Sequence, residues 1–260
     1  MTYEKVLYSL HDGVARISMN DPATRNAGST QMGEELLHAF DRAEAEARAV
    51  LFTGEGKAFN SGANLADAEA IMDDPLRDVG VLLDRYYNPL VIRMKTMNQP
   101  VVTAIRGAAA GVGCGLAMAG DLIVCGEGGF FLQAFRHVGL APDGGSSWLL
   151  TKAVGRVRAM EMMLLGERLY GRQAHEWGLV NRVVPDDEVE TAAMDLAREL
   201  ARGPRSLGII KHVAWAAADM TLEEALTYER LHQREACRTE DFVEGISAFA
   251  GKRAAEFKGR

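Results

Sequence analysis

The sequence predicts an α/β fold built around a largely parallel sheet. Short apolar segments typical of strands recur through the first two thirds of the chain, and segments with a helical spacing of apolar residues separate them. Beyond Pro185, every remaining segment has a helical pattern. These two observations predict a sheet-containing core followed by a helical C-terminal region, and the alternation of strands with helices favours parallel pairing.

Each element follows from a local pattern. Residues 6–10 and 14–19 are β-rich and flank the turn HDG, which predicts an N-terminal hairpin. The next helix, 32–46, has apolar residues at helical spacing, namely Met32, Leu36, Leu37, Phe40 and Ala43. The later strands are predicted at 49–53, 100–105, 121–125 and 179–184, and the later helices at 84–97, 114–119, 188–201, 205–219, 222–238 and 241–257.

Two parts of the chain are expected, a core over residues 1–200 and a helical region over 201–260. The helical region carries several apolar faces on a short length of chain. Those faces either form subunit contacts or pack against one another, and the sequence leaves both open.

The composition narrows the functional classes. The chain has 260 residues, of which 48% are hydrophobic, and a formal net charge of −7, which argues against nonspecific nucleic-acid binding. Its three cysteines form no CxxC pair, so neither a disulfide framework nor a zinc knuckle is indicated. No segment approaches the ~20 apolar residues of a membrane span, and the start lacks a signal-peptide pattern. A cytoplasmic protein is expected.

The sequence contains incomplete matches to several common binding and catalytic motifs. GVGCGL lacks the third glycine of a dinucleotide-binding turn, because Leu116 stands there. GGSSW ends on Trp148 where a nucleophile elbow needs glycine. His175 and Glu176 do not start a metal-binding HExxH helix, because Leu179 occupies the second histidine position. The sequence therefore gives no support for a metal site.

Two glycine-rich turns remain, and each follows a predicted strand: GEGKAFNSGANL and RGAAAGVGCGLAMAGD. Together they resemble the crotonase superfamily of enoyl-CoA hydratases and isomerases, whose usual strings are GxGxAFxAGADL and NGxAxGGGxxLAxxCD. The resemblance extends over essentially the whole chain. It implies the crotonase (ClpP-like) fold, in which repeated ββα units form a spiral core and a C-terminal helical region mediates trimerisation.

The resemblance also implies an oxyanion hole. A thioester that becomes an enolate gathers negative charge on its oxygen, and two preorganised backbone N–H groups stabilise that charge. By the family pattern these donors are the amides of Ala63 and Val112. Glycine allows the backbone to approach closely at such turns, and the helix dipole at Val112 favours negative charge.

The acid and base residues distinguish family members. Hydratases hold water with two glutamates, but this chain has Gly115 and Phe135 at those positions. Asp143 stands where double-bond isomerases of the family carry an aspartate, and apolar surroundings would make it a stronger base. The alternative is that Asp143 caps the helix that follows it.

LAPDGGSSWLL, RYYNPLVIRM and AHEWG resemble the 1,2-epoxyphenylacetyl-CoA isomerase branch of phenylacetate catabolism in particular. Within that resemblance Asp143 would be the single proton shuttle of an acyl-CoA isomerase that shifts a double bond, or opens a ring epoxide, in an enoyl- or aryl-derived CoA thioester. Two other readings stay open: a hydratase that uses Glu127 or His137 as its base, and a noncatalytic acyl-CoA-binding protein.

The resemblance further implies substrate contacts. The nucleotide end of CoA would lie near Arg25 and Ala27, with Lys258 meeting a phosphate from a neighbouring subunit. The backbone of Ala63 to Leu65 would line the pantetheine path. An acyl or aryl pocket would come from Tyr86, Tyr87, Leu90 and Phe135, although these residues could equally be ordinary helix core. The full expected set is Arg25, Ala27, Gly62, Asn64, Leu65, Tyr86, Tyr87, Leu90, Gly111, Phe135 and Lys258. No metal or redox cofactor is expected, since coenzyme A is part of the substrate, and the expected assembly is a homotrimer or a dimer of trimers.

Overall fold

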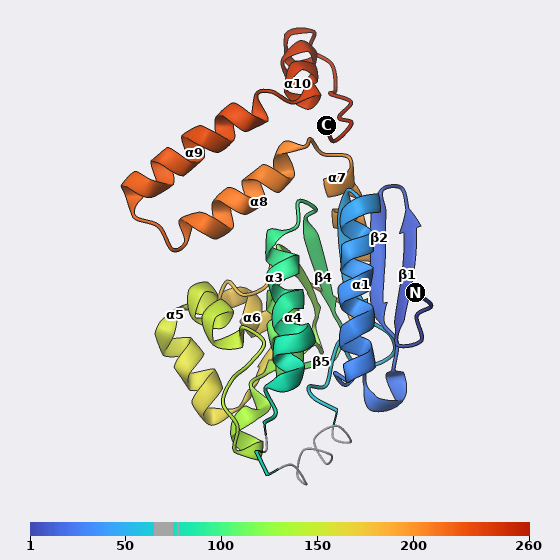
Figure 1. Ribbon diagram of the computed structural model, residues 1–260, viewed down its shortest axis with the longest axis vertical. Helices are drawn as coiled ribbons and strands as arrows, with labels where there is room; N and C mark the ends of the chain where they lie inside the picture. Colours follow the sequence, from blue (N-terminus) through green and yellow to red (C-terminus); the bar gives the residue numbers. More distant parts are fainter. Residues whose placement is uncertain (65–74, 77) are drawn as a thin grey trace.

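The computed structural model describes residues 1–64, 75–76 and 78–260, so the predicted contact residue Leu65 lies outside the described residues. Its main sheet has six strands in the order β1-β2-β3-β4-β6-β9 (Figure 1). Only the β1–β2 hairpin is antiparallel in this sheet, and each of the other four pairings is parallel. The strands are β1 (Val6–His11), β2 (Val14–Met19), β3 (Ala49–Gly54), β4 (Val101–Ile105), β6 (Leu122–Gly126) and β9 (Arg182–Val184).

Helices cover both faces of this sheet, as the near-continuous apolar strands require. Along β3, Val50 and Phe52 pack on the side of helix α1 (Thr30–Glu46), whereas Ala49 and Leu51 pack on the side of helix α7 (Val189–Ala201). This alternation is the two-residue period of a strand. The α/β class is therefore confirmed, and α7 belongs to the sheet layers.

A second, smaller layer was not predicted from the sequence. Strands β5 (Ala108–Ala110), β7 (Phe130–Leu132) and β8 (Arg168–Tyr170) form a three-stranded sheet next to the first. Among the described residues, the remaining elements of the core are η1 (Pro22–Thr24), η2 (Leu83–Tyr87), α3 (Asn88–Thr96), α4 (Val112–Met118), η3 (Ala134–Val138), α5 (Ser146–Leu165) and α6 (Gly171–Glu176). Three-residue strands are too short to give a clear periodic signal.

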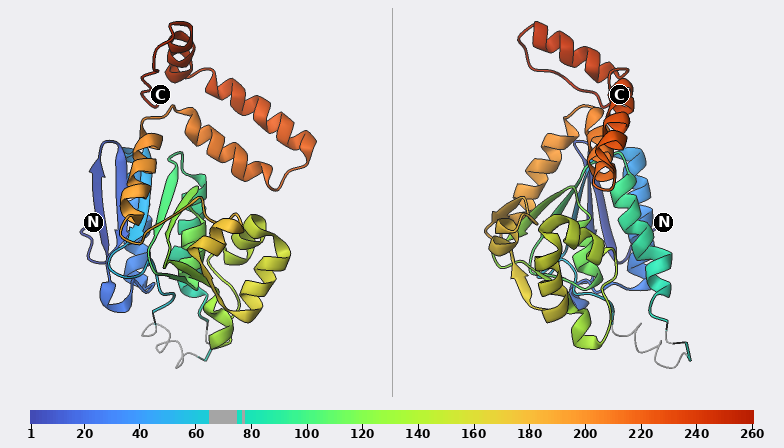
Figure 2. Two further views of the ribbon diagram at one scale, coloured as in Figure 1. Left: turned by 180° about the vertical axis from the view of Figure 1, so that it is seen from behind. Right: turned by 90° about the vertical axis from the view of Figure 1, so that its left-hand side faces the viewer.

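Helices α8 (Ser206–Ala217), α9 (Leu222–Ala236) and α10 (Glu240–Ala250) form an arm that extends from one end of the core (Figures 1 and 2). A buried ion pair ties α8 to the core: Lys211 Nζ lies 2.9 Å from Asp121 Oδ2 and also donates to the carbonyls of Met94 and Gln99. All three N–H donors of the Lys211 ammonium group therefore have an acceptor, which a buried charge requires.

The predicted helix 241–257 ends early. α10 stops at Ala250, and Lys252 adopts a left-handed φ of 51°. The tail then runs back along α10, where the Asp241 carboxylate accepts the backbone N–H groups of Lys258 and Gly259. These hydrogen bonds to the buried Asp241 carboxylate stabilise the folded-back tail, and they decide its conformation despite the helical sequence pattern of these last residues.

Candidate active site

The first glycine-rich turn, which follows β3, is organised by a buried asparagine. Asn60 Oδ1 accepts the N–H of Gly62 at 2.9 Å, and its Nδ2 donates to the carbonyl of Asn26 at 2.5 Å. Gly62 has a φ of +102°, a conformation that side chains disfavour. Asn26 in turn donates to the carbonyl of Ala58. The fully buried side-chain amides of Asn26 and Asn60 therefore fix the conformation of the turn.

In this conformation the backbone N–H of Ala63 points away from the neighbouring segment around Gly28. Gly28 N–H donates to the Gly62 carbonyl at 2.7 Å, and Asn64 N–H donates to the Gly28 carbonyl at 3.0 Å. In such a parallel bridge the residue between the two bonds, Ala63, directs its own N–H to the opposite side. Within the described part of the chain, that N–H has no hydrogen-bond acceptor.

The second glycine-rich turn lies directly against the first. Asn60 N–H donates to the Ala108 carbonyl, and Ala110 N–H donates to the Asn60 carbonyl. Gly111, with φ +53° and ψ −127°, then leads into α4, whose first residue is Val112. The Val112 N–H also finds no acceptor among the residues that the structure describes. Each of the two unpaired backbone amides thus follows a glycine, and the two glycines lie side by side in space. This arrangement suits the binding of a developing oxyanion.

Asp143 lies in a turn packed on the start of α4. Its backbone carbonyl accepts the N–H of Ser146 at 2.9 Å, and Gly144 and Gly145 between them have φ values of +56° and +76°. A Cβ atom on Gly144 would lie 3.0 Å from Val112 Cγ2. The residue that follows Asp143 therefore packs against Val112, whose amide forms half of the candidate oxyanion hole.

The carboxyl group of Asp143 is poorly solvated. Its Oδ1 atom is buried and has no hydrogen-bond partner among the described residues. Desolvation raises its pKa from 3.8 to about 6. The side chain does not act as the N-cap of α5, because the N-cap is Gly145 and Asp143 Oδ1 accepts no hydrogen bond from the described residues. The carboxylate thus has the environment of a base and not that of a helix cap.

The two positions of the hydratase glutamates carry no carboxylate here. A Cβ atom on Gly115 would lie 2.1 Å from the Gly144 carbonyl oxygen, so a glutamate does not fit beside the Asp143 turn. Phe135, at the other position, is buried in η3. Asp143 consequently stands without a second carboxylate from either position.

The two alternative bases are engaged elsewhere. His137 Nε2 lies 2.9 Å from the carbonyl oxygen of Gly166, an acceptor, so this nitrogen carries the proton and secures the end of α5. Glu127 is exposed and forms an ion pair with Arg172 at 3.0 Å. Neither contact prepares a side chain for proton transfer at the glycine turns.

The predicted acyl-pocket residues have different surroundings. Tyr87 and Leu90 are buried in the main core, and the Tyr87 hydroxyl donates to the Ser29 carbonyl at 2.9 Å. Tyr86 is half-buried and packs on α1, where a Cβ atom on Gly33 would lie 2.7 Å from Tyr86 Cβ. Phe135, in η3, is also buried, so Tyr86 is the most exposed of the four predicted pocket residues.

The predicted CoA contacts fall in two places. Arg25 is exposed, and its carbonyl accepts the Ser61 N–H at 3.1 Å, so this segment borders the first glycine turn together with the buried Ala27. Lys258 is exposed in the tail beside α10, on the arm, and the arm lies away from α4 and β5 (Figure 1). Within one subunit the structure does not bring Lys258 to the candidate site.

Sequence reasoning missed Asn26 and Asn60. Asn60 lies inside the quoted string GEGKAFNSGANL and Asn26 lies just before Ala27, where both look like ordinary turn residues, and only their complete burial reveals that they hold the two segments together. A polar residue directly after an apolar pair, as Asn60 is in AFNSG, was the available signal.

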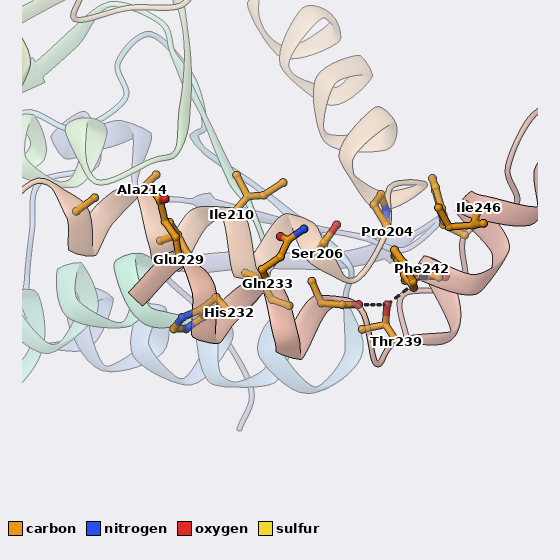
Figure 3. A pocket seen from close by; sticks show the side chains of 17 residues that line it. Pro204, Ser206, Ile210, Ala214, Glu229, His232, Gln233, Thr239, Phe242 and Ile246 are labelled. Carbon is orange, nitrogen blue, oxygen red and sulfur yellow. Dashed lines mark hydrogen bonds between the residues drawn. The ribbon is translucent and has the colours of Figure 1, made fainter. Parts of the chain in front are cut away.

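Two apolar grooves lie away from this site. One, of about 620 Å³, runs between α8 and the helices α9 and α10, and Figure 3 shows Ile210 and Ala214 opposite His232 and Gln233. The other, of about 550 Å³, separates α8 from the core and includes Trp215. Neither is lined by Ala63, Val112 or Asp143. Both grooves involve the arm, not the glycine turns.

The parallel sheet, the two apposed glycine turns and the arm define a crotonase-fold protein. A family model described as enoyl-CoA hydratase/isomerase matches residues 9–260, and the chain belongs to this family. The chain is 39% identical over 260 residues to the "1,2-epoxyphenylacetyl-CoA isomerase" of Escherichia coli K12, covering 99% of each chain. It is 37% identical over the full length of both chains to a Rhodobacter capsulatus protein named "Probable enoyl-CoA hydratase".

The crystal structure of an enoyl-CoA hydratase from Bacillus anthracis has a TM-score of 0.92 and 27% identity, and the match covers 99% of this chain and 100% of that one. The crotonase fold expected from the sequence is thus confirmed. Among the described residues, no helix is long and apolar enough to cross a membrane, and no cluster of three or more His, Cys, Asp or Glu side chains could hold a metal ion.

Proposed function

We propose that this chain is an acyl-CoA isomerase in which Asp143 is the single proton shuttle. The observation that carries the proposal is the buried, unpartnered carboxyl oxygen of Asp143 in a turn packed against Val112. Gly115 and Phe135 supply no second carboxylate to activate water. One base and two free amides suffice to move a double bond.

The proposed reaction uses one proton and leaves no net change in the enzyme. The Asp143 carboxylate removes a proton from the carbon next to the thioester carbonyl, and the electron pair moves onto the thioester oxygen. The amides of Ala63 and Val112 stabilise this enolate. Asp143, now protonated, returns the proton to the carbon two positions further along, which shifts the double bond into conjugation. A pKa near 6 suits both steps at neutral pH.

The finer substrate assignment rests on similarity. The E. coli relative is named for a ring epoxide of phenylacetyl-CoA, so we include an aryl-derived thioester among the proposed substrates, alongside linear 3-enoyl-CoA. Tyr86 and Phe135 would contact the acyl or aryl group. The proposed chemistry needs neither a metal nor a redox cofactor, because a carboxylate moves the proton and amides hold the charge.

The proposed assembly is a homotrimer or a dimer of trimers in the cytoplasm. Large apolar side chains on the arm support the assembly, since they are more than half exposed in the single chain: Ile210, Leu222, Leu226, Val243, Ile246 and Phe249. In such an assembly Lys258 would meet the CoA phosphate of a neighbouring subunit.

The test is to incubate the purified protein with a 3-enoyl-CoA and, separately, with a 2-enoyl-CoA, following conjugation by absorbance and hydration by mass. We expect conjugation of the 3-enoyl substrate with no gain of water. Asp143→Asn should lower kcat about 10²- to 10⁴-fold while acyl-CoA binding persists. The control is Asp195→Asn on α7, because Asp195 has a side chain that is 67% exposed.

Three results would contradict the proposal. Water addition to the 2-enoyl substrate would favour a hydratase. An active Asp143→Asn variant would place the base elsewhere, at Glu127 or His137. Binding of acyl-CoA without turnover of either linear or aryl substrates would favour a noncatalytic protein.

A further inference from the structure

Helix α4 approaches the main chain of the Asp143 turn most closely at Gly115. A Cβ atom on Gly115 would lie 2.1 Å from the carbonyl oxygen of Gly144, 2.9 Å from its carbonyl carbon and 3.2 Å from Ser146 Oγ. The first two distances are shorter than real Cβ contacts allow. The obstacle is main chain, so no side-chain rotation can relieve the clash.

We propose that Gly115 is a positioning residue for Asp143: its lack of a side chain lets the 143–146 turn lie flat on α4 and holds the carboxyl beside the two free amides. This inference rests on the proposed function, and it adds a second residue to the proton shuttle. Gly115 acts through Asp143 and does not itself touch the reacting atoms.

The turn cannot move away without moving Asp143. On one side of the turn, Gly144 already lies close to Val112, since a Cβ atom there would be 3.0 Å from Val112 Cγ2. On the other, Ser146 is fully buried and begins α5, whose Leu150 is part of the core. A side chain at Gly115 must therefore lift the whole turn from α4. A shift of ~1 Å at a catalytic group costs about 100-fold in rate.

The neighbouring glycine of α4 has a different contact. A Cβ atom on Gly113 would lie 2.3 Å from Asn60 Oδ1, in the first glycine turn. The two glycines thus seat the helix against the oxyanion turn at Gly113 and against the base at Gly115. A change at Gly115 is expected to disturb the base while leaving the Asn60 contact in place.

The experiment is a double-mutant cycle with Gly115→Ala and Asp143→Asn, each alone and combined, assayed on a 3-enoyl-CoA. Binding of a saturated acyl-CoA and the midpoint of thermal unfolding are measured for every variant. We expect Gly115→Ala to lower kcat about 100-fold with KM and acyl-CoA binding changed less than about threefold. In the Asp143→Asn background the same change should have almost no further effect.

The matched control is Gly245→Ala in α10, where the added Cβ would lie 3.6 Å from the Phe257 ring, an ordinary contact. It should leave kcat unchanged. The inference is overturned if Gly115→Ala keeps full kcat, if its penalty is the same with and without Asp143, or if the variant no longer folds or binds acyl-CoA, since the contact would then be general packing. If Asp143→Asn itself keeps full activity, the proposed function fails instead.

Discussion

Gly62 and Gly111 lie against each other, such that a Cβ atom on Gly111 would be 3.4 Å from the Cα of Gly62. They belong to turns almost fifty residues apart in the sequence, and each immediately precedes a backbone amide without an acceptor in the described structure. Both have positive φ values. This contact between two main chains is what converts two separate turns into one site for negative charge.

Replacing Gly111 by alanine should impair catalysis more than binding. Alanine tolerates a φ of +53° poorly, so relaxation of the turn would rotate the Val112 amide that follows. Loss of one oxyanion donor lowers kcat about 10²- to 10³-fold. Steady-state kinetics on a 3-enoyl-CoA measures this. Gly178→Ala is the control, because Gly178 also has a positive φ, +80°, and open space around it. Equal losses of kcat in both variants would mean that backbone strain, and not the position of the Val112 amide, causes the effect.

The pH dependence of kcat/KM should report Asp143. Burial raises its pKa to about 6, and a base acts in its ionised form. The rate should therefore rise with pH below about 6 and level off above it. The residual rate of Asp143→Asn should lack this rise. A wild-type profile that is flat down to pH about 4.5 would show that the carboxyl is ionised throughout and is not buried as described.

Asp143 should cost the protein stability at neutral pH. Because its folded-state pKa of about 6 exceeds the ordinary 3.8, the folded protein binds the proton more tightly, and the free energy of unfolding falls as pH rises between these values. Asp143→Asn should therefore be more stable than wild type at pH 8, by up to about 2 kcal/mol, with the difference shrinking toward pH 4. Urea unfolding at both pH values measures it, and a difference independent of pH would contradict the argument.

Asn60 should be important for stability as well as for the site. Its removal leaves the Gly62 N–H and the Asn26 carbonyl buried without these partners. Asn60→Ala should lower the free energy of unfolding by about 2 to 4 kcal/mol. Chemical denaturation checks this against Asn88→Ala, where the side chain makes a long contact of 3.5 Å with Asp84. Similar losses of the free energy of unfolding in the two variants would mean that the Asn60 side chain contributes no more to stability than that of Asn88.

Prediction from the sequence succeeded where the signal was local and periodic. The hairpin of β1 and β2, helix α1 and the parallel strands were expected from apolar spacing and are present. The small sheet of β5, β7 and β8 was not expected, and the helix predicted over 241–257 ends at Ala250. In both cases long-range hydrogen bonds, such as those to Asp241, decide the structure, and no local pattern contains them.

The sequence by itself determined the α/β class and the crotonase resemblance, because apolar periodicity and two ordered glycine strings are properties of the chain in one dimension. It also showed which carboxylates are missing, since Gly115 and Phe135 can be identified directly. The tertiary structure alone decided what Asp143 and Gly115 are near. Burial of Asp143 Oδ1, the closeness of Gly115 to Gly144 and the contact of Gly62 with Gly111 arise from packing between distant segments, which no single segment encodes.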